Sequence, residues 1–112
     1  MTDKIVILST CGSPEEAEKI ARLLVQQHLA ACVNIIPRMR SVYRWNGAVE
    51  TAEESLLVIK SSRELFDSLR PVLEQAHSYE VPEAIALAIL DGAGTYMNWL
   101  EANLRKPDGD GG

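Results

Sequence analysis

The chain has 112 residues, a length that accommodates one domain and excludes two of ordinary size. Its hydrophobic fraction of 46% and charged fraction of 24% are typical of a globular protein and exclude an extensively disordered chain. The net charge of −5 argues against a nucleic-acid binder, and two cysteines are too few for a secreted disulfide framework. We expect one domain over residues 1–105 and a disordered polar tail over 106–112.

The first predicted elements are a buried strand and a helix. The apolar, β-branched run over residues 4–10 predicts a strand covered on both faces. Ser13 and Glu16, at capping-box spacing, mark the start of a helix that reaches about Leu29. Cys11 falls in the loop between them. We interpret it as a small loop residue, because no histidine is near it in sequence and no Cys-x-x-Cys motif is present.

A long hairpin follows in the middle of the chain. Residues 31–36 begin a strand, Pro37 predicts a bulge or bend, and extended character resumes at 41–45. Asn46-Gly47 predicts a type I′ turn, because both central residues of that turn need a positive φ. The chain then returns as a strand over 48–59. Two arms of this length overhang a small domain, which favours contact with other subunits.

The second half contains another helix and another strand. Ser61 and Glu64, again at capping-box spacing, predict a helix that Pro71 should kink or restart. The apolar run over 84–90 fits a central strand, and residues 96–104 form a short amphipathic helix. The resulting order is strand–helix–strand–strand–helix–strand plus a C-terminal helix. It predicts a ferredoxin-like α+β fold whose antiparallel sheet has both main helices on one face. We expect other subunits to cover the opposite face.

The polar loop after the second helix contains candidate metal ligands. His77 lies near Glu80 and Glu83, and imidazole with carboxylate groups suits copper or zinc. A surface or intersubunit structural role is the alternative for this loop. Cys32 sits in an apolar strand, where a cysteine is usually a small buried hydrophobe. The sequence has no Ser-His-Asp order, metalloprotease helix or dinucleotide fingerprint, so it predicts no enzyme.

The hairpin contains candidate groups for anion binding and for subunit contact. Arg38, Arg40 and Arg44 cluster around its bend and are suited to bidentate contacts with an anion. The alternative pairs these arginines with acidic residues of a neighbouring subunit. Tyr43 and Trp45, near the tip, are aromatic anchors of the type found at interfaces.

Three segments resemble the signature of the CutA family of divalent-cation tolerance proteins. They are residues 29–35 with 41–47, the loop 77–83, and Tyr96 with Trp99. The family usually has proline after the loop histidine, where this chain has Ser78. The resemblance implies a ferredoxin-like fold and a tight homotrimer similar to the PII signalling proteins, with Trp99 also expected at the interface.

The resemblance also implies a role in tolerance of copper and other divalent cations. By position, it makes Cys32 and His77 the residues to test as ligands, because a threefold assembly brings copies from three chains near one another. We expect a non-enzymatic cytoplasmic homotrimer with no obligatory cofactor and no nucleic-acid or membrane partner. It would bind copper or another divalent cation weakly at intersubunit clefts lined by His77, Glu80 and Glu83. A PII-like trimer that senses a small anionic metabolite, and a structural trimeric scaffold for partner proteins, are the alternatives.

Overall fold

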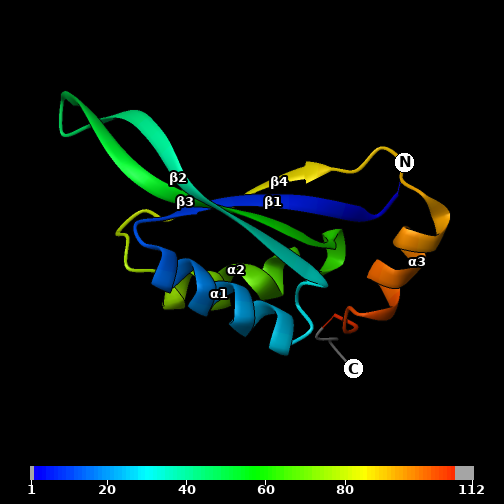
Figure 1. The fold of residues 1–112 in the computed structure, drawn as a ribbon. Helices are drawn as coiled ribbons and strands as arrows, with labels where there is room; N and C mark the ends of the chain where they lie inside the picture. Colours follow the sequence, from blue (N-terminus) through cyan, green and yellow to red (C-terminus); the bar gives the residue numbers. More distant parts are fainter. Residues whose placement is uncertain (1, 108–112) are drawn as a thin grey trace.

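The structure, a computed structural model, describes residues 2–107, in which four strands form one antiparallel sheet in the order β2-β3-β1-β4. Along the chain the elements are β1 (Lys4–Cys11), α1 (Pro14–Gln26), β2 (Cys32–Trp45), β3 (Ala48–Ser62), η1 (Arg63–Leu65), α2 (Phe66–Ala76), β4 (Ile85–Ala88) and α3 (Gly94–Ala102). The predicted ferredoxin-like α+β fold is therefore confirmed (Figure 1). Residues 108–112 of the predicted tail lie outside the described residues.

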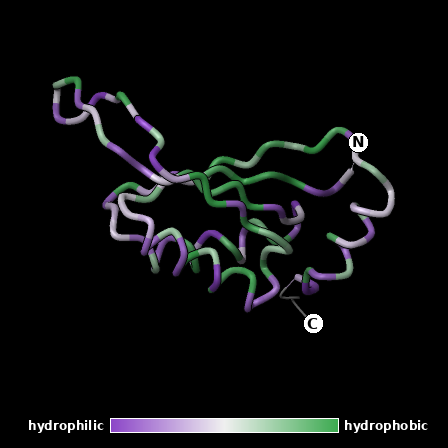
Figure 2. Tube along the Cα trace, viewed as in Figure 1, coloured by the Kyte–Doolittle hydropathy of each residue, from purple (hydrophilic) through white to green (hydrophobic). Residues whose placement is uncertain are grey.

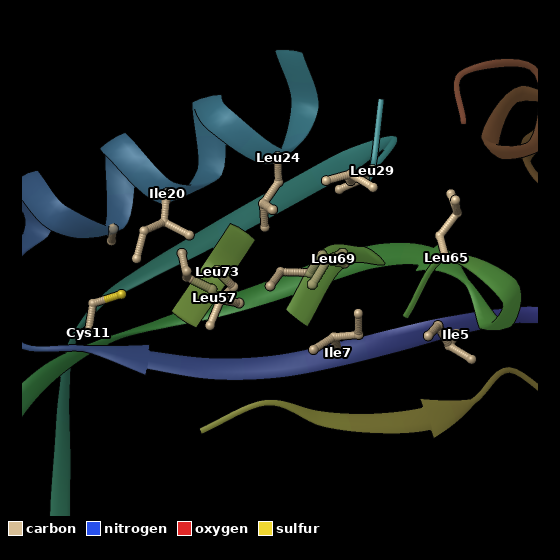
Figure 3. Packing of buried hydrophobic residues seen from close by; sticks show 13 residues of the cluster. Ile5, Ile7, Cys11, Ile20, Leu24, Leu29, Leu57, Leu65, Leu69 and Leu73 are labelled. Atoms are coloured by element: carbon tan, nitrogen blue, oxygen red, sulfur yellow. The ribbon is translucent and has the colours of Figure 1, made fainter. Parts of the chain in front are cut away.

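The hydrophobic core lies between the sheet and the helices α1 and α2, which share one face of the sheet (Figure 1). Side chains alternate between the two faces of a strand, so every second residue of β1 and β3 points into this layer. Figure 3 shows the core residues Ile5, Ile7, Cys11, Ile20, Leu24, Leu29, Leu57, Leu65, Leu69 and Leu73. Burial of this cluster holds both helices against the sheet.

The other face of the sheet is also apolar, and neither α1 nor α2 covers it. Leu8 lies opposite Val58 and Ile85 in the strand register, and Ile36 lies opposite Leu56. Ile36 and Ile85 are 48% and 51% exposed. Figure 2 shows the hydrophobic colouring along these strands. We call this surface the open face and define it by Val6, Leu8, Ile36, Leu56, Val58, Ile85 and Leu87.

The β2–β3 hairpin extends well beyond the other strands (Figure 1). Its turn residues Asn46 and Gly47 have φ values of 51° and 80°, which confirms the predicted turn with two positive φ angles. The predicted irregularity at Pro37 is confirmed too, because the strand register shifts between Ile36 and Met39. The residue after the proline, Arg38, adopts a φ of 60° within this bulge.

The first helix ends earlier than predicted, at Gln26 rather than near Leu29. His28 takes a left-handed conformation with a φ of 57°. The backbone N–H groups of Leu29 and Ala30 then both donate to the Leu24 carbonyl, which satisfies a terminal group of the helix. The apolar spacing continues past the end of the helix because Leu29 and Ala30 belong to the core.

Two predictions for the second half are wrong. The last strand is shorter than the predicted run over 84–90, and it lies at the edge of the sheet rather than in its centre. Its alanines give little side-chain surface to a central position. Ser61 does not begin a helix, because β3 continues to Ser62 and the helix starts through η1 without a side-chain cap. Pro71 lies inside α2, which continues as one helix to Ala76, so the helix does not restart at the proline.

Two fully buried serines give a matched test of what a buried hydroxyl contributes. Ser61 Oγ donates to the Leu29 carbonyl at 2.6 Å, whereas Ser9 Oγ has no hydrogen-bond partner within residues 2–107. We expect Ser61→Ala to lower the free energy of unfolding by about 1–3 kcal/mol, because it leaves a buried carbonyl unpaired. Ser9→Ala should leave stability unchanged or raise it by about 1 kcal/mol. Urea unfolding of both variants measures the difference, and an equal loss in both would contradict it.

Candidate metal site at the end of strand β1

The antiparallel pairing of β1 with β4 determines where the candidate site forms. Leu8 near the end of β1 lies opposite Ile85 at the start of β4. The loop over 77–84, which connects α2 to β4, must therefore return to the carboxyl end of β1. This brings His77, the residue after α2, to Cys11, the last residue of β1.

A cysteine, a glutamate and a histidine meet at this point. One ligand atom each from Cys11, Glu16 and His77 lie within 4.8 Å of one another, and Cys11 Sγ is 3.9 Å from His77 Nε2. Cys11 is fully buried, and His77 is 9% exposed. Cys11 therefore ends β1 rather than lying in the loop as predicted, and although no histidine is near it in sequence, the fold brings His77 beside it from 66 positions away. We call these three residues the Cys11 cluster.

The two ring nitrogens of His77 have defined roles. The backbone N–H of Tyr79 donates to Nδ1 at 3.1 Å, so Nδ1 is the unprotonated nitrogen. Nε2 then carries the proton and donates to the Thr10 carbonyl at 2.7 Å. Because Nε2 faces Cys11 as an N–H group, it does not act as a base toward the thiol in this arrangement.

Glu16 departs from the predicted capping box. The Glu16 backbone N–H donates to Ser13 Oγ at 3.2 Å, which confirms half of that motif. The carboxylate, however, accepts from the Ser78 backbone N–H at 2.7 Å and from Ser78 Oγ at 3.0 Å. Glu16 therefore links the first turn of α1 to the loop that contains His77.

Tyr79 attaches the same loop to the base of the hairpin. Its hydroxyl donates to Glu54 at 2.6 Å, and burial together with this hydrogen bond raises the pKa of Tyr79. A Cβ on Gly12 would lie 3.1 Å from the Tyr79 hydroxyl, so glycine gives the ring room. Burial and the charge of Glu54 raise the pKa of Glu83 as well. The surroundings of the cluster are thus acidic.

These surroundings make the Cys11 thiol unreactive. Burial, followed by the charges of Glu16 and Glu54, raises its pKa to about 12. Nucleophilic cysteines have the opposite environment, with a nearby cation that stabilises the thiolate. A divalent cation would change this balance, because a bound metal stabilises the thiolate and is attracted by the two carboxylates.

The residues predicted as metal ligands are not brought together within one chain. Cys32 pairs with Lys60 at one end of the sheet, whereas Cys11 pairs with Ser55 at the other. Five residues of strand separate these positions, about 17 Å. Glu80 and Glu83 follow His77 in the loop but are not part of the Cys11 cluster. The structure adds Cys11 and Glu16 to His77. The sequence signal for their proximity is the predicted antiparallel sheet, because pairing the last strand with the first returns the loop after α2 to the end of β1.

The structure places two of the three predicted anion-binding arginines at one surface cavity. Arg38 and Arg40 line a shallow surface cavity of about 350 Å³ with Glu53, whereas Arg44 is not part of its lining. Glu53 lies opposite Arg40 in the register and offers it an acidic neighbour. Tyr43 and Trp45 on the hairpin are 40% and 41% exposed, and Trp99 on α3 is 46% exposed and stacks on Tyr96. These three aromatic residues remain available for subunit contact.

The fold and the cluster together define a class: a small ferredoxin-like α+β protein with thiolate, imidazole and carboxylate donors at the end of its first strand. This donor set suits zinc and copper. The CutA1 divalent ion tolerance protein family matches residues 5–103. The chain belongs to this family, as the sequence resemblance predicted.

Individual relatives agree with this assignment. The divalent-cation tolerance protein CutA of Thermus thermophilus is 44% identical over 98 residues, 88% of this chain and 95% of that protein. The chloroplastic protein CutA of Arabidopsis thaliana is 43% identical over 101 residues, 90% of this chain but only 56% of that protein. The crystal structure of CutA1 from Oryza sativa superposes with a TM-score of 0.90 at 41% identity, covering 92% of this chain and 94% of that one.

No helix within residues 2–107 is long and apolar enough to span a membrane.

Proposed function

We propose that this chain is a non-enzymatic, homotrimeric protein of divalent-cation tolerance that binds copper or another divalent cation weakly through the Cys11 cluster. The observation that carries the proposal is the meeting of Cys11, Glu16 and His77 within 4.8 Å. Thiolate and imidazole donors favour zinc and copper over magnesium or calcium. Membership of the CutA1 family supports a cation ligand.

Weak affinity follows from the state of the ligand atoms. A tetrahedral zinc site holds its ligand atoms roughly 3.5 Å apart, so the Cys11 cluster must contract by about 1 Å. Before these atoms bind metal, the Cys11 thiol must lose its proton, and the His77 proton must move from Nε2 to Nδ1, which ends the hydrogen bond that Nδ1 accepts from the Tyr79 N–H. The Nε2–H group must also give up its hydrogen bond to the Thr10 carbonyl.

The homotrimer is supported by the apolar open face and by the long hairpin. Ile36, Ile85 and Leu87, each about half exposed, lie on the open face. Copies of the chain arranged around a threefold axis would cover this face and would place the hairpin aromatics Tyr43 and Trp45 against a neighbour. In such an assembly, Cys32 and the glutamates of the 77–83 loop are further candidates for ligands at the clefts between subunits.

A metal titration with single-ligand variants tests the site. We expect wild-type protein to bind Zn²⁺ and Cu²⁺. His77→Ala and Cys11→Ser should each lower the metal affinity by more than about tenfold, because removing even an outer-shell partner costs roughly that much. Isothermal calorimetry in a weakly coordinating buffer measures the affinity. Zn²⁺ is included because it has no redox chemistry with the thiol.

Cys32→Ser is the matched control, because it removes the other cysteine of the chain without touching the Cys11 cluster. Unchanged affinity in Cys32→Ser with weakened binding in Cys11→Ser supports the cluster. The opposite pattern would assign the site to Cys32 and to the subunit clefts. Equal binding by wild type, Cys11→Ser and His77→Ala would refute the site.

A trimer that senses a small anionic metabolite is the second candidate function, favoured by the cavity next to Arg38 and Arg40. A ligand of the folded protein raises its Tm, so a thermal-shift screen with nucleotides and organic acids tests it. Arg40→Gln should abolish any shift. A stable partner recovered by pull-down, without metal or metabolite binding, would favour the third candidate, a structural scaffold.

A cytoplasmic location is also part of the proposal. The composition and the two unpaired cysteines agree with a reducing compartment. The Arabidopsis relative is named as chloroplastic, so family membership alone does not define the compartment. Cell fractionation tests the location directly.

A further inference from the structure

Ser78 holds both oxygens of the Glu16 carboxylate. Its backbone N–H donates to one oxygen at 2.7 Å, and its hydroxyl donates to the other at 3.0 Å. Glu16 and Ser78 are 62 residues apart, and Ser78 directly follows His77. The pair therefore joins two members of the Cys11 cluster, one from α1 and one from the loop after α2.

The capping-box spacing of Glu16 offers its carboxylate a different partner from Ser78. Glu16 is the third residue of α1, with Ser13 as its N-cap. In a complete capping box the glutamate returns to the backbone N–H of the N-cap residue. Glu16 instead reaches across to the loop, where its carboxylate oxygen lies within 4.8 Å of the Cys11 and His77 ligand atoms.

The two hydrogen bonds leave the carboxylate able to bind a metal ion. An ionised carboxylate has about four lone-pair sites, and Ser78 occupies one on each oxygen. A lone pair on each oxygen is therefore free for a cation. Hydrogen bonds from an outer shell orient a ligating carboxylate and typically change metal affinity by about ten- to a hundredfold.

We propose that Ser78 is a positioning residue, which keeps the Glu16 carboxylate in the Cys11 cluster and thereby sets its affinity for divalent cations. This inference rests on the proposed function. The backbone and hydroxyl donors of Ser78 both hold Glu16, and His77 is the residue directly before them. Position 78 would thus influence the affinity through Glu16, without itself being one of the three residues of the Cys11 cluster.

Variants at position 78 separate the two donors. Ser78→Ala removes only the hydroxyl and should weaken Zn²⁺ binding by about tenfold, the lower end of the outer-shell range. Ser78→Pro removes the N–H as well and should weaken binding further. His77 has a ψ of 142°, the extended conformation that a residue before proline prefers, so its backbone is compatible with proline at position 78. Ser78→Thr keeps both donors and should restore affinity.

A double-mutant cycle with Glu16→Gln tests whether Ser78 acts through Glu16. If it does, Ser78→Ala should have no further effect on Zn²⁺ affinity in the Glu16→Gln background. Additive losses, or tighter binding by Ser78→Ala, would overturn the inference, the latter by showing that Ser78 competes with the metal. These outcomes differ from failure of the proposed function, in which wild type, Cys11→Ser and His77→Ala bind Zn²⁺ alike. Thermal melts of the metal-free variants confirm that each is folded.

Discussion

If the proposed homotrimer forms through the open face, Ile85→Glu is expected to convert it into a monomer of 12.4 kDa. Ile85 is 51% exposed in the single chain, so a glutamate at this edge position is tolerated by the fold of one copy. If other subunits cover the open face, the same carboxylate becomes buried without a partner, at a cost of several kcal/mol at each of three equivalent interfaces. Size-exclusion chromatography with light scattering measures the mass.

Val25→Glu is the matched control for this variant. Val25 is 39% exposed but lies on α1, on the opposite side of the sheet from the open face. Its substitution should leave the proposed trimer intact. A wild-type monomer, or an Ile85→Glu protein that stays trimeric, would refute the role of the open face. Far-UV circular dichroism distinguishes a folded monomer from an unfolded chain.

Local sequence patterns predict much of the fold, because its hairpin turn and its bulge are each encoded within a few residues. Asn46-Gly47 determines the hairpin turn, and Pro37 marks the bulge that follows it in the structure. Where the prediction failed, a long-range contact decided the outcome. Ser61 has the spacing of a helix cap, yet its hydroxyl donates to Leu29 across the core and its backbone continues β3.

The candidate site was harder to predict because no segment of the sequence contains it. Cys11 and Glu16 belong to the junction of β1 and α1, whereas His77 follows α2. The antiparallel pairing of Leu8 with Ile85, a contact between residues far apart in the sequence, brings the two segments together. The sequence did indicate His77 as a candidate ligand, from its polar loop and from the family resemblance. The family resemblance pairs His77 with Cys32, which the register places at the other end of the sheet.

Cys11 in the folded protein is expected to react with iodoacetamide about a thousandfold more slowly than an exposed thiol. Its pKa of about 12, against an ordinary value of 9.0, lowers the thiolate fraction near neutral pH by roughly that factor. Complete burial slows the reaction further, because reagent reaches the sulfur only when the site opens. Mass spectrometry of peptides after timed labelling gives the rate, with the half-buried Cys32 as a reference within the same chain.

The pH dependence of this labelling separates the charge of the thiol from its inaccessibility. The folded state holds the Cys11 proton more tightly than the unfolded chain, so this group stabilises the fold below the ordinary thiol pKa and loses that contribution as pH rises toward 12. Labelling of native Cys11 should therefore stay slow from about pH 6 to 9, whereas both cysteines react in denaturant. Glu16→Gln removes one of the two nearby carboxylates and should accelerate labelling only modestly, because burial is the leading cause of the raised pKa. Rapid labelling of Cys11 in the native protein at neutral pH would contradict the buried, protonated thiol and would favour a reactive cysteine instead.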